Sequence, residues 1–293
     1  MAIAVLTELL VFAGIFSIYR QNARDQYYKQ TGQAISLLSD SIRKNIAELE
    51  QGIVYKVWGS NIFRSDYDAF QDDLYLYQRN LQKLASMFQM SRMPLKSIYS
   101  CDSQDHEAYY SVSNENIKSL AEYRGTEIAD YIAENKEKIT GKYGGTWFRR
   151  CNDRPDSVYI IKNVIDTSST DYLGTLVLEV DQKYLQGMYE SVGTAYESEF
   201  VLYEGDELLS CENDFQSEAE MYFSVLSDSG TESSWNGYLV CKGSVSRTGW
   251  TIAVFKSESE LLEGLKEMVP RLLLFGAMTL ILSFIFAKWI SET

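Results

Sequence analysis

The stretch Tyr172-Leu-Gly-Thr-Leu-Val-Leu-Glu-Val-Asp181 is an almost continuous apolar run that ends at an aspartate. Such a run predicts a strand that is buried in a sheet. Shorter β-like runs precede it, and the Asp, Ser, Asn and Gly residues between the runs favour an antiparallel sheet. The expected strands are 95–100, 108–113, 145–149, 158–165 and 173–180, with a helical stretch at 114–138 after the second strand.

The same order of elements occurs a second time along the chain. Expected strands at 200–203 and 207–211 flank Glu204-Gly205-Asp206, which is a hairpin signal. A helical stretch at 217–226 follows, and then strands at 233–236, 238–244 and 250–255, the last within Gly249-Trp-Thr-Ile-Ala-Val-Phe255. The repeated order predicts two consecutive α+β units with antiparallel sheets, divided near 184–196.

Helical patterns precede and follow the two units. Apolar residues recur every three or four positions in a first helix expected at 20–57, which places them on one face. That face packs either against a sheet or against a second copy of the chain. A second helix is expected at 66–90, and a return helix at 257–268 follows the last strand. The residues of the apolar face are Leu38, Ile42, Ile46, Leu49, Ile53 and Val57.

Both ends of the sequence are apolar and almost free of charge. The segments 2–18 and 272–289 approach the length of about 20 residues that a membrane-spanning helix needs, so we expect spans at 1–19 and 270–290. Glu8 then lies near the interface, faces the other helices or is a functional charge. A cleavable signal peptide is the alternative for the N-terminus, but the basic region and the small-residue cleavage pattern are missing. Long domains translocate largely regardless of charge, and roughly 250 residues lie between the two expected spans while the visible flanks are short. This architecture, together with the resemblance described below, favours a location of residues 20–268 outside the cytoplasm.

Composition excludes some partners and leaves the state of the cysteines open. The net charge of −14 disfavours binding to nucleic acid or to anionic lipid. The four cysteines are spaced in a way that matches no zinc pattern, so neither a metal nor a cofactor is expected. Two disulfides and buried free thiols are both compatible with the sequence. The cysteines are Cys101, Cys151, Cys211 and Cys241.

With these elements the chain resembles the double Cache (PAS-like) sensor domain of bacterial transmembrane receptors. Leu95-Lys-Ser-Ile-Tyr-Ser100 and the two strand sequences quoted above carry the resemblance. The tail Ala287-Lys-Trp-Ile-Ser-Glu292 resembles the entry to a HAMP linker in YesM-like sensor histidine kinases. The resemblance implies two helices at 20–92, a membrane-distal subdomain at 93–183, a membrane-proximal subdomain at 184–256, a return helix at 257–269 and the start of a linker at 291–293.

Residues for catalysis are not apparent in the sequence. The only histidine, His106, lies in a polar turn beside two acidic residues, and it is expected at the surface. There is no serine-hydrolase, P-loop or zinc-protease motif, and no histidine completes a Ser or Cys dyad. We therefore expect no enzyme in this chain. If the parent protein is a kinase, its phosphoacceptor histidine and ATP site lie beyond residue 293.

The resemblance places a ligand pocket between the distal sheet and the helix that follows its second strand. The residues that fall there are Tyr123 and Arg124 on the helix, Trp147 and Tyr159 on later strands, and Asp166 in the loop before the last strand. Aromatic walls with a few charged groups suit a small polar ligand. Alternatively, the two strand aromatics belong to the core and the aspartate forms a turn. The helix lacks the pattern with which amino-acid-binding members recognise an amine, which leaves sugars, carboxylates or a partner protein as ligands.

The resulting functional hypothesis is the input half of a two-component sensor histidine kinase, a homodimer with a response regulator downstream. Ligand binding would favour one conformation of the distal subdomain, and the first and return helices would transmit the difference to the membrane spans. The alternatives are the sensor of a chemoreceptor or of a cyclic-dinucleotide enzyme, and a stand-alone membrane-anchored binding protein.

Overall fold

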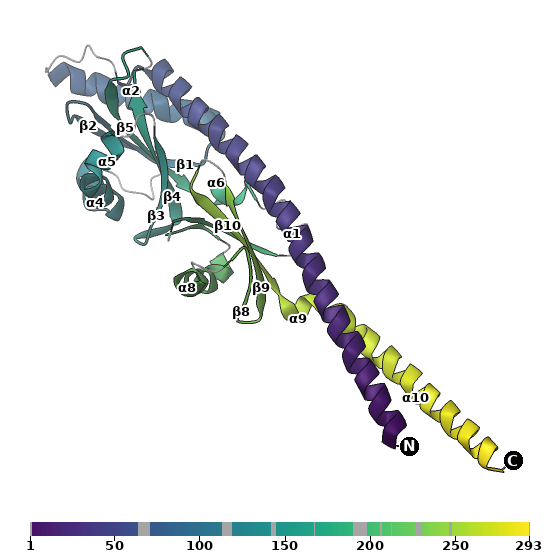
Figure 1. The fold of residues 1–293 in the computed structure, drawn as a ribbon. Helices are drawn as coiled ribbons and strands as arrows, with labels where there is room; N and C mark the ends of the chain where they lie inside the picture. Colours follow the sequence, from purple (N-terminus) through teal and green to yellow (C-terminus); the bar gives the residue numbers. More distant parts are fainter. Residues whose placement is uncertain are drawn as a thin grey trace.

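Two antiparallel sheets lie one after the other beside a long helix, α1 (Ala2–Ser60), as Figure 1 shows. The computed structural model describes residues 2–63, 71–112, 119–141, 145–166, 168–189, 198–205, 207–211, 213–226, 230–245 and 248–292. We call β1–β5 the distal sheet and β6–β10 the proximal sheet, because the proximal sheet lies nearer to the two chain ends.

The distal sheet has the strand order β2-β1-β5-β4-β3. Three short helices, α3 (Leu120–Tyr123), α4 (Glu127–Glu134) and α5 (Lys136–Thr140), connect its second and third strands. The strands are β1 (Leu95–Asp102), β2 (Glu107–Ser111), β3 (Thr146–Cys151), β4 (Arg154–Ile165) and β5 (Tyr172–Asp181).

The proximal sheet repeats this topology with the order β7-β6-β10-β9-β8. The short helix α6 (Lys183–Gln186) follows the last strand of the distal sheet. Between the second and third strands of the proximal sheet lie the one-turn helix η1 (Asn213–Phe215) and α8 (Gln216–Leu226). The repeated strand order confirms the predicted α+β class with two antiparallel units. The strands are β6 (Glu199–Glu204), β7 (Glu207–Ser210), β8 (Glu232–Trp235), β9 (Tyr238–Val245) and β10 (Trp250–Ser257).

Helices differ from their predicted limits more than strands do. The helical segments expected at 1–19 and 20–57 form one continuous helix that ends at Ser60, and the second helix, α2, covers Gln71–Met90, with residues 66–70 outside the described part. The single helix expected at 114–138 is divided into α3, α4 and α5, and residues 114–118 are not described. Side-chain bonds explain the division, because Ser119 caps the start of α3 and the Thr126 hydroxyl donates to the Tyr123 carbonyl at 2.7 Å.

The apolar face predicted on the first helix packs inside the protein. Its residues join α2 and one face of both sheets in a single hydrophobic cluster, so the prediction of packing against a sheet is confirmed. Burial of each such aliphatic side chain stabilises the fold by about 1.5–3 kcal/mol. Packing of α1 against a second copy stays a prediction. The buried members are Leu38, Ile42, Ile46, Ile53 and Val57, and Leu49 is partly buried.

A close approach of α1 to the proximal sheet occurs at Gly243 on β9. A Cβ atom added there would lie 2.4 Å from Cγ2 of Ile35 on α1. We therefore expect Gly243→Ala to lower the free energy of unfolding by about 1–3 kcal/mol. Gly32→Ala is the control, because an added Cβ there meets nothing within 4 Å, and it should raise the stability of the helix by about 1 kcal/mol. Urea denaturation of both variants measures the difference, and equal stabilities would contradict the close packing.

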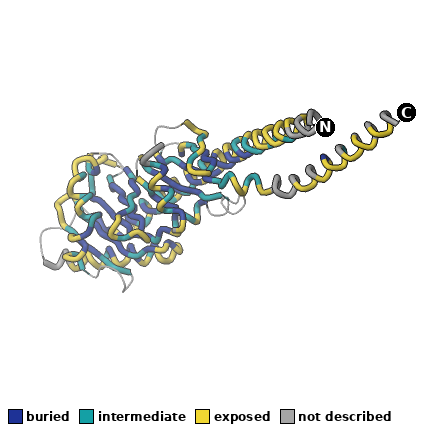
Figure 2. The backbone as a smooth tube through the Cα atoms, turned by 90° about the horizontal axis from the view of Figure 1, so that it is seen from below, coloured by how far each residue is buried: buried dark blue, intermediate teal, exposed yellow. Residues whose placement is uncertain are grey.

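The helices at the two chain ends extend together beyond the proximal sheet. After β10, α9 (Glu258–Leu261) leads into α10 (Glu263–Glu292), which runs beside the first part of α1 (Figures 1 and 2). Arg20 on α1 is paired with Glu258 at 2.7 Å. Among the described residues, no helix combines the length and apolarity required to cross a bilayer. The predicted spans at 1–19 and 270–290 are therefore not confirmed.

Candidate ligand-binding site

A cavity of about 390 Å³ lies in the distal unit, between the helices α3–α5 and the sheet. Strands β1 and β5 supply its floor, α4 and α5 supply apolar side chains, and the end of the β1–β2 hairpin supplies acidic ones. The lining includes the aromatic residues Tyr99, Tyr123 and Tyr172, the apolar residues Ala129, Ile132, Ala133 and Ile139, and the charged residues Asp105, Glu107, Arg124, Asp130 and Lys136.

Two ion pairs connect the hairpin to the helices at this cavity. Arg124, which follows α3, donates from Nε to Glu107 at 3.0 Å, and Lys136 on α5 is paired with Asp105. The hydrogen bond from Lys136 lowers the pKa of the Asp105 carboxyl, and the hydrogen bond to Glu107 raises the pKa of Arg124. These pairs are largely exposed, and exposed pairs contribute little to stability, so a ligand that carries both charges can replace a pair at small cost.

A stack of tyrosines forms the inner wall. The ring of Tyr123 lies between those of Tyr99 and Tyr109, with centroid distances of 4.4 and 5.2 Å. The Tyr99 hydroxyl donates to Glu107 at 2.6 Å, and burial raises the pKa of Tyr99 so that it remains a neutral donor. The Tyr123 hydroxyl is buried and has no hydrogen-bond partner among the described residues. A buried polar group without a partner costs about 1–3 kcal/mol, which a bound ligand can recover.

The five residues named from the sequence occupy different places. Tyr123 and Arg124 line the cavity together. Trp147 and Tyr159 are 9% and 1% exposed and pack in the hydrophobic cluster of the same sheet face. Asp166 lies in the turn after β4, where its carboxylate accepts the Ser168 amide at 2.7 Å. The structure thus brings the two helix residues to the cavity, while a ligand contact of the other three stays a prediction.

Sequence reasoning missed the charged residues of the hairpin. The segment around His106 was interpreted only as a surface turn, and the His106 ring is indeed exposed, 2.9 Å from the Asp102 carboxylate. Cys101 pairs with Glu107 across β1 and β2, and both residues line the cavity. The alternation of side chains along these two strands could therefore have indicated that Glu107 belongs to the site. Their partners Arg124 and Lys136 lie in a different segment, so the ion pairs themselves had no local signal.

All four cysteines are free thiols in the structure. Of the two alternatives that the sequence left open, the structure therefore contains the thiols and not the disulfides. Cys151, Cys211 and Cys241 are buried, and Cys101 is half-buried at the cavity. Burial raises the pKa of the Cys101 thiol to about 11, so this group is protonated at neutral pH.

Comparison with known proteins gives matches only at the level of structure. No protein-family model and no curated protein matches the sequence. The sensory domain of the Campylobacter jejuni chemoreceptor Tlp3 is 8% identical with a TM-score of 0.53, over 83% of this chain and 98% of that domain. The ligand-binding domain of the Pseudomonas fluorescens chemoreceptor CtaA, in complex with L-isoleucine, is 10% identical with a TM-score of 0.53 over the same shares.

A third similar structure comes from a different class of receptor. The extracellular domain of soHK1S-Z6, described as a histidine kinase, is 16% identical with a TM-score of 0.50, over 83% of this chain and 98% of that domain. Identities this low establish the fold and leave ligand and output open. The chemoreceptor structures are a sensory domain and a ligand-binding domain, and the third structure is an extracellular domain. In fold, the chain therefore resembles the extracellular and ligand-binding domains of these chemoreceptors and of this histidine kinase.

Proposed function

We propose that this chain is the extracytoplasmic sensing part of a transmembrane receptor and that its distal cavity binds a small polar ligand. The observation that carries the proposal is Tyr123, a residue that lines a cavity edged by charged groups and whose buried hydroxyl has no partner among the described residues. A group of this kind is costly in the empty protein and favourable once a ligand supplies a partner.

The charged residues of the cavity favour a ligand that carries both a positive and a negative charge, or no charge. Arg124 and Lys136 are each neutralised by an acidic residue, so a singly charged ligand would leave one of these partners uncompensated. An amino acid or another zwitterion can replace both halves of a pair. The chemoreceptor domains that resemble this chain were solved with amino acids, which makes amino acids the first class to test.

A chain of contacts joins the cavity to the proximal unit. The Arg149 guanidinium on β3 lies 4.0 Å from the centroid of the Tyr131 ring on α4, and it is also paired with Glu207 on β7. Movement of α4 on ligand binding can therefore reach the proximal sheet, and from there α1 and α10. We infer that residues 20–268 lie outside the cell, that 1–19 and 270–290 are the anchors, and that the receptor is a homodimer.

For the output we propose a sensor histidine kinase of the YesM-like type, which would act on a response regulator. A chemoreceptor is the second candidate, because domains of both classes share this fold. The coding sequence that follows residue 293 distinguishes them. A HAMP linker and a histidine-bearing helix would support the kinase, whereas a long methyl-accepting coiled coil would assign the chain to a chemoreceptor.

Two variants of residues that line the cavity, Tyr123→Phe and Arg124→Ala, test the ligand proposal. The purified chain is screened by thermal shift against the amino acids, dicarboxylates and monosaccharides, and the compound with the largest shift is titrated calorimetrically. Tyr123→Phe should weaken binding about tenfold while leaving the empty protein as stable as before or more stable. Arg124→Ala should weaken binding by a similar factor.

The matched control is Tyr203→Phe in the proximal unit. The Tyr203 hydroxyl is buried and donates to the Ala219 carbonyl at 2.8 Å, so its removal should lower stability and leave affinity unchanged. A screen in which none of these compounds raises the melting temperature would contradict the ligand proposal. Equal affinities of the wild type and Tyr123→Phe would remove the tyrosine hydroxyl from the site.

A further inference from the structure

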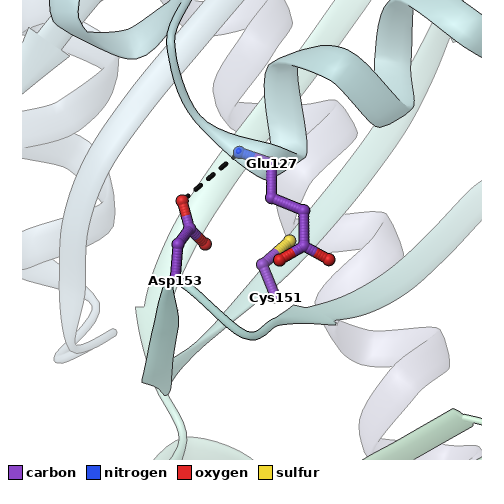
Figure 3. Close-up of side chains that lie close together, drawn as sticks. All are labelled: Glu127, Cys151 and Asp153. Carbon is purple, nitrogen blue, oxygen red and sulfur yellow. Dashed lines mark hydrogen bonds between the residues drawn. The ribbon is translucent and has the colours of Figure 1, made fainter.

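Three side chains that are able to ligate metals converge where α4 begins beside the turn between β3 and β4. Glu127, Cys151 and Asp153 each offer one ligand atom, and these atoms lie within 4.8 Å of one another (Figure 3). We propose that these residues bind one divalent transition-metal ion of the zinc type. The site differs from the ligand cavity, whose lining contains none of the three.

Backbone hydrogen bonds hold both carboxylates in place. Asp153 accepts the Glu127 amide through Oδ2 at 3.3 Å, and Glu127 accepts the Asn152 amide through Oε2 at 2.8 Å. Each bond occupies one oxygen and leaves the second oxygen of the same carboxylate available to a metal. Metal-ligating carboxylates are commonly oriented by hydrogen bonds of this kind.

Hydrogen bonding within the protein does not explain the position of the Cys151 thiol. Cys151 is 1% exposed and forms no disulfide, and its thiol has no hydrogen bond within the described part of the chain. Figure 3 shows its sulfur beside the Glu127 carboxylate. Capping of α4 accounts for the position of the Asp153 carboxylate, and the bond from the Asn152 amide accounts for that of Glu127. Neither bond accounts for a buried thiol that faces them.

The local charges favour a cation. Within the described residues, neither Glu127 nor Asp153 is paired with a lysine or an arginine. Arg149, on the strand that ends at Cys151, is already paired with Glu207. A metal ion would neutralise the two carboxylates, which otherwise repel one another, and the thiolate that forms when the thiol proton is released to solvent as the metal–sulfur bond forms.

The ligand set selects the class of metal. One thiolate and two carboxylates suit zinc, cobalt or cadmium, whereas calcium and magnesium prefer oxygen ligands alone. Ligand atoms of a tetrahedral zinc site lie about 3.3–3.8 Å apart, given bonds of about 2.0–2.3 Å, so the three groups need to approach by about 1 Å. Asp153 is exposed and Glu127 is half-buried, which leaves both free to adjust, and water completes the fourth position.

A metal at this position would fix one wall of the ligand cavity. Glu127 is the first residue of α4, and the same helix carries Ala129, Asp130 and Ala133 of the cavity lining. The metal would join the start of α4 to the β3–β4 turn. Metal occupancy is therefore expected to alter the affinity of the cavity for its small-molecule ligand. The metal itself binds whether or not that small molecule is present.

Cobalt titration of the full chain, freed of metal with a chelator and kept reduced, tests the proposal. Co²⁺ should produce a thiolate-to-cobalt charge-transfer band that saturates at one ion per chain, and Zn²⁺ should abolish the band by displacement. Cys151→Ser should eliminate the band and weaken zinc binding by about a hundredfold or more. Asp153→Asn, which retains an oxygen for the Glu127 amide, should weaken it by about tenfold to a hundredfold.

Cys241→Ser is the matched control, because Cys241 is also a buried free thiol. The Cys241→Ser variant should retain the full cobalt band. If Cys151→Ser does not fold, the assignment is tested by Asp153→Asn, which leaves the core intact, together with this control. A wild type without the band, a band that persists in Cys151→Ser, or an Asp153→Asn variant with undiminished zinc affinity would each overturn the proposal.

Discussion

Replacement of Trp250 by alanine is expected to lower the free energy of unfolding by about 3–5 kcal/mol. Trp250 on β10 is 1% exposed, and its ring meets the edge of Phe148 on β3 at a centroid distance of 4.7 Å. It thus lies where the proximal sheet contacts the distal one. Truncation removes this contact and enlarges a cavity of about 780 Å³ that Trp250 already borders together with α1.

Urea denaturation followed by circular dichroism measures the effect. Trp58→Ala is the matched control, because Trp58 on α1 is 42% exposed and its loss should change stability by only about 0.5 kcal/mol. A similar loss in both variants would show that Trp250 has no special role in joining the sheets.

Removal of the Glu179 side chain is expected to have an effect of similar size, about 3–5 kcal/mol for Glu179→Ala. Glu179 on β5 is 1% exposed, and its carboxylate accepts from Arg154 at 3.1 Å, Ser97 at 2.6 Å and Ser157 at 3.0 Å. Its loss removes the acceptor from three donors at once, two of them buried hydroxyls. The large cost comes mainly from the groups left behind, since a buried pair itself contributes little net stability.

Glu179→Gln separates charge from shape in the same network. The amide oxygen can still accept from the serines but no longer compensates Arg154, so we expect an intermediate loss of about 1.5–3 kcal/mol. Glu220→Gln on the exposed face of α8 is the control and should be within about 0.5 kcal/mol of the wild type. Thermal and urea unfolding give the order of the variants, and a Glu179→Ala protein as stable as the wild type would contradict the role of the network.

Strands were easier to predict than helices in this chain. The apolar runs of β4, β5 and β10 are bounded by polar turns, and burial of those runs is a local consequence of composition. The segment between β2 and β3 has helical composition throughout, but Ser119 and Thr126 divide it through bonds to nearby backbone groups. Such competition between side-chain and backbone bonding is only weakly visible in a hydrophobic pattern.

The candidate site could be predicted only in part, for a similar reason. Tyr123 and Arg124 fall next to the cavity because the position of their helix follows from the order of elements. Asp166 has the same residue type as Asp105, but a serine two residues later satisfies it locally, so it belongs to a turn. Asp105 instead pairs with Lys136, which lies in a different segment of the chain.

By itself the sequence determined the two-unit α+β architecture and the apolar face of the first helix, because alternation, turn residues and helical periodicity act over neighbouring positions. The tertiary structure alone decided which polar and charged side chains meet. Glu107 with Arg124, Arg149 with Glu207, and Cys151 with Glu127 are separated along the chain, and they become neighbours only when strands and helices pack. Contacts of this kind depend on the relative placement of whole elements, and local patterns contain no information about that placement.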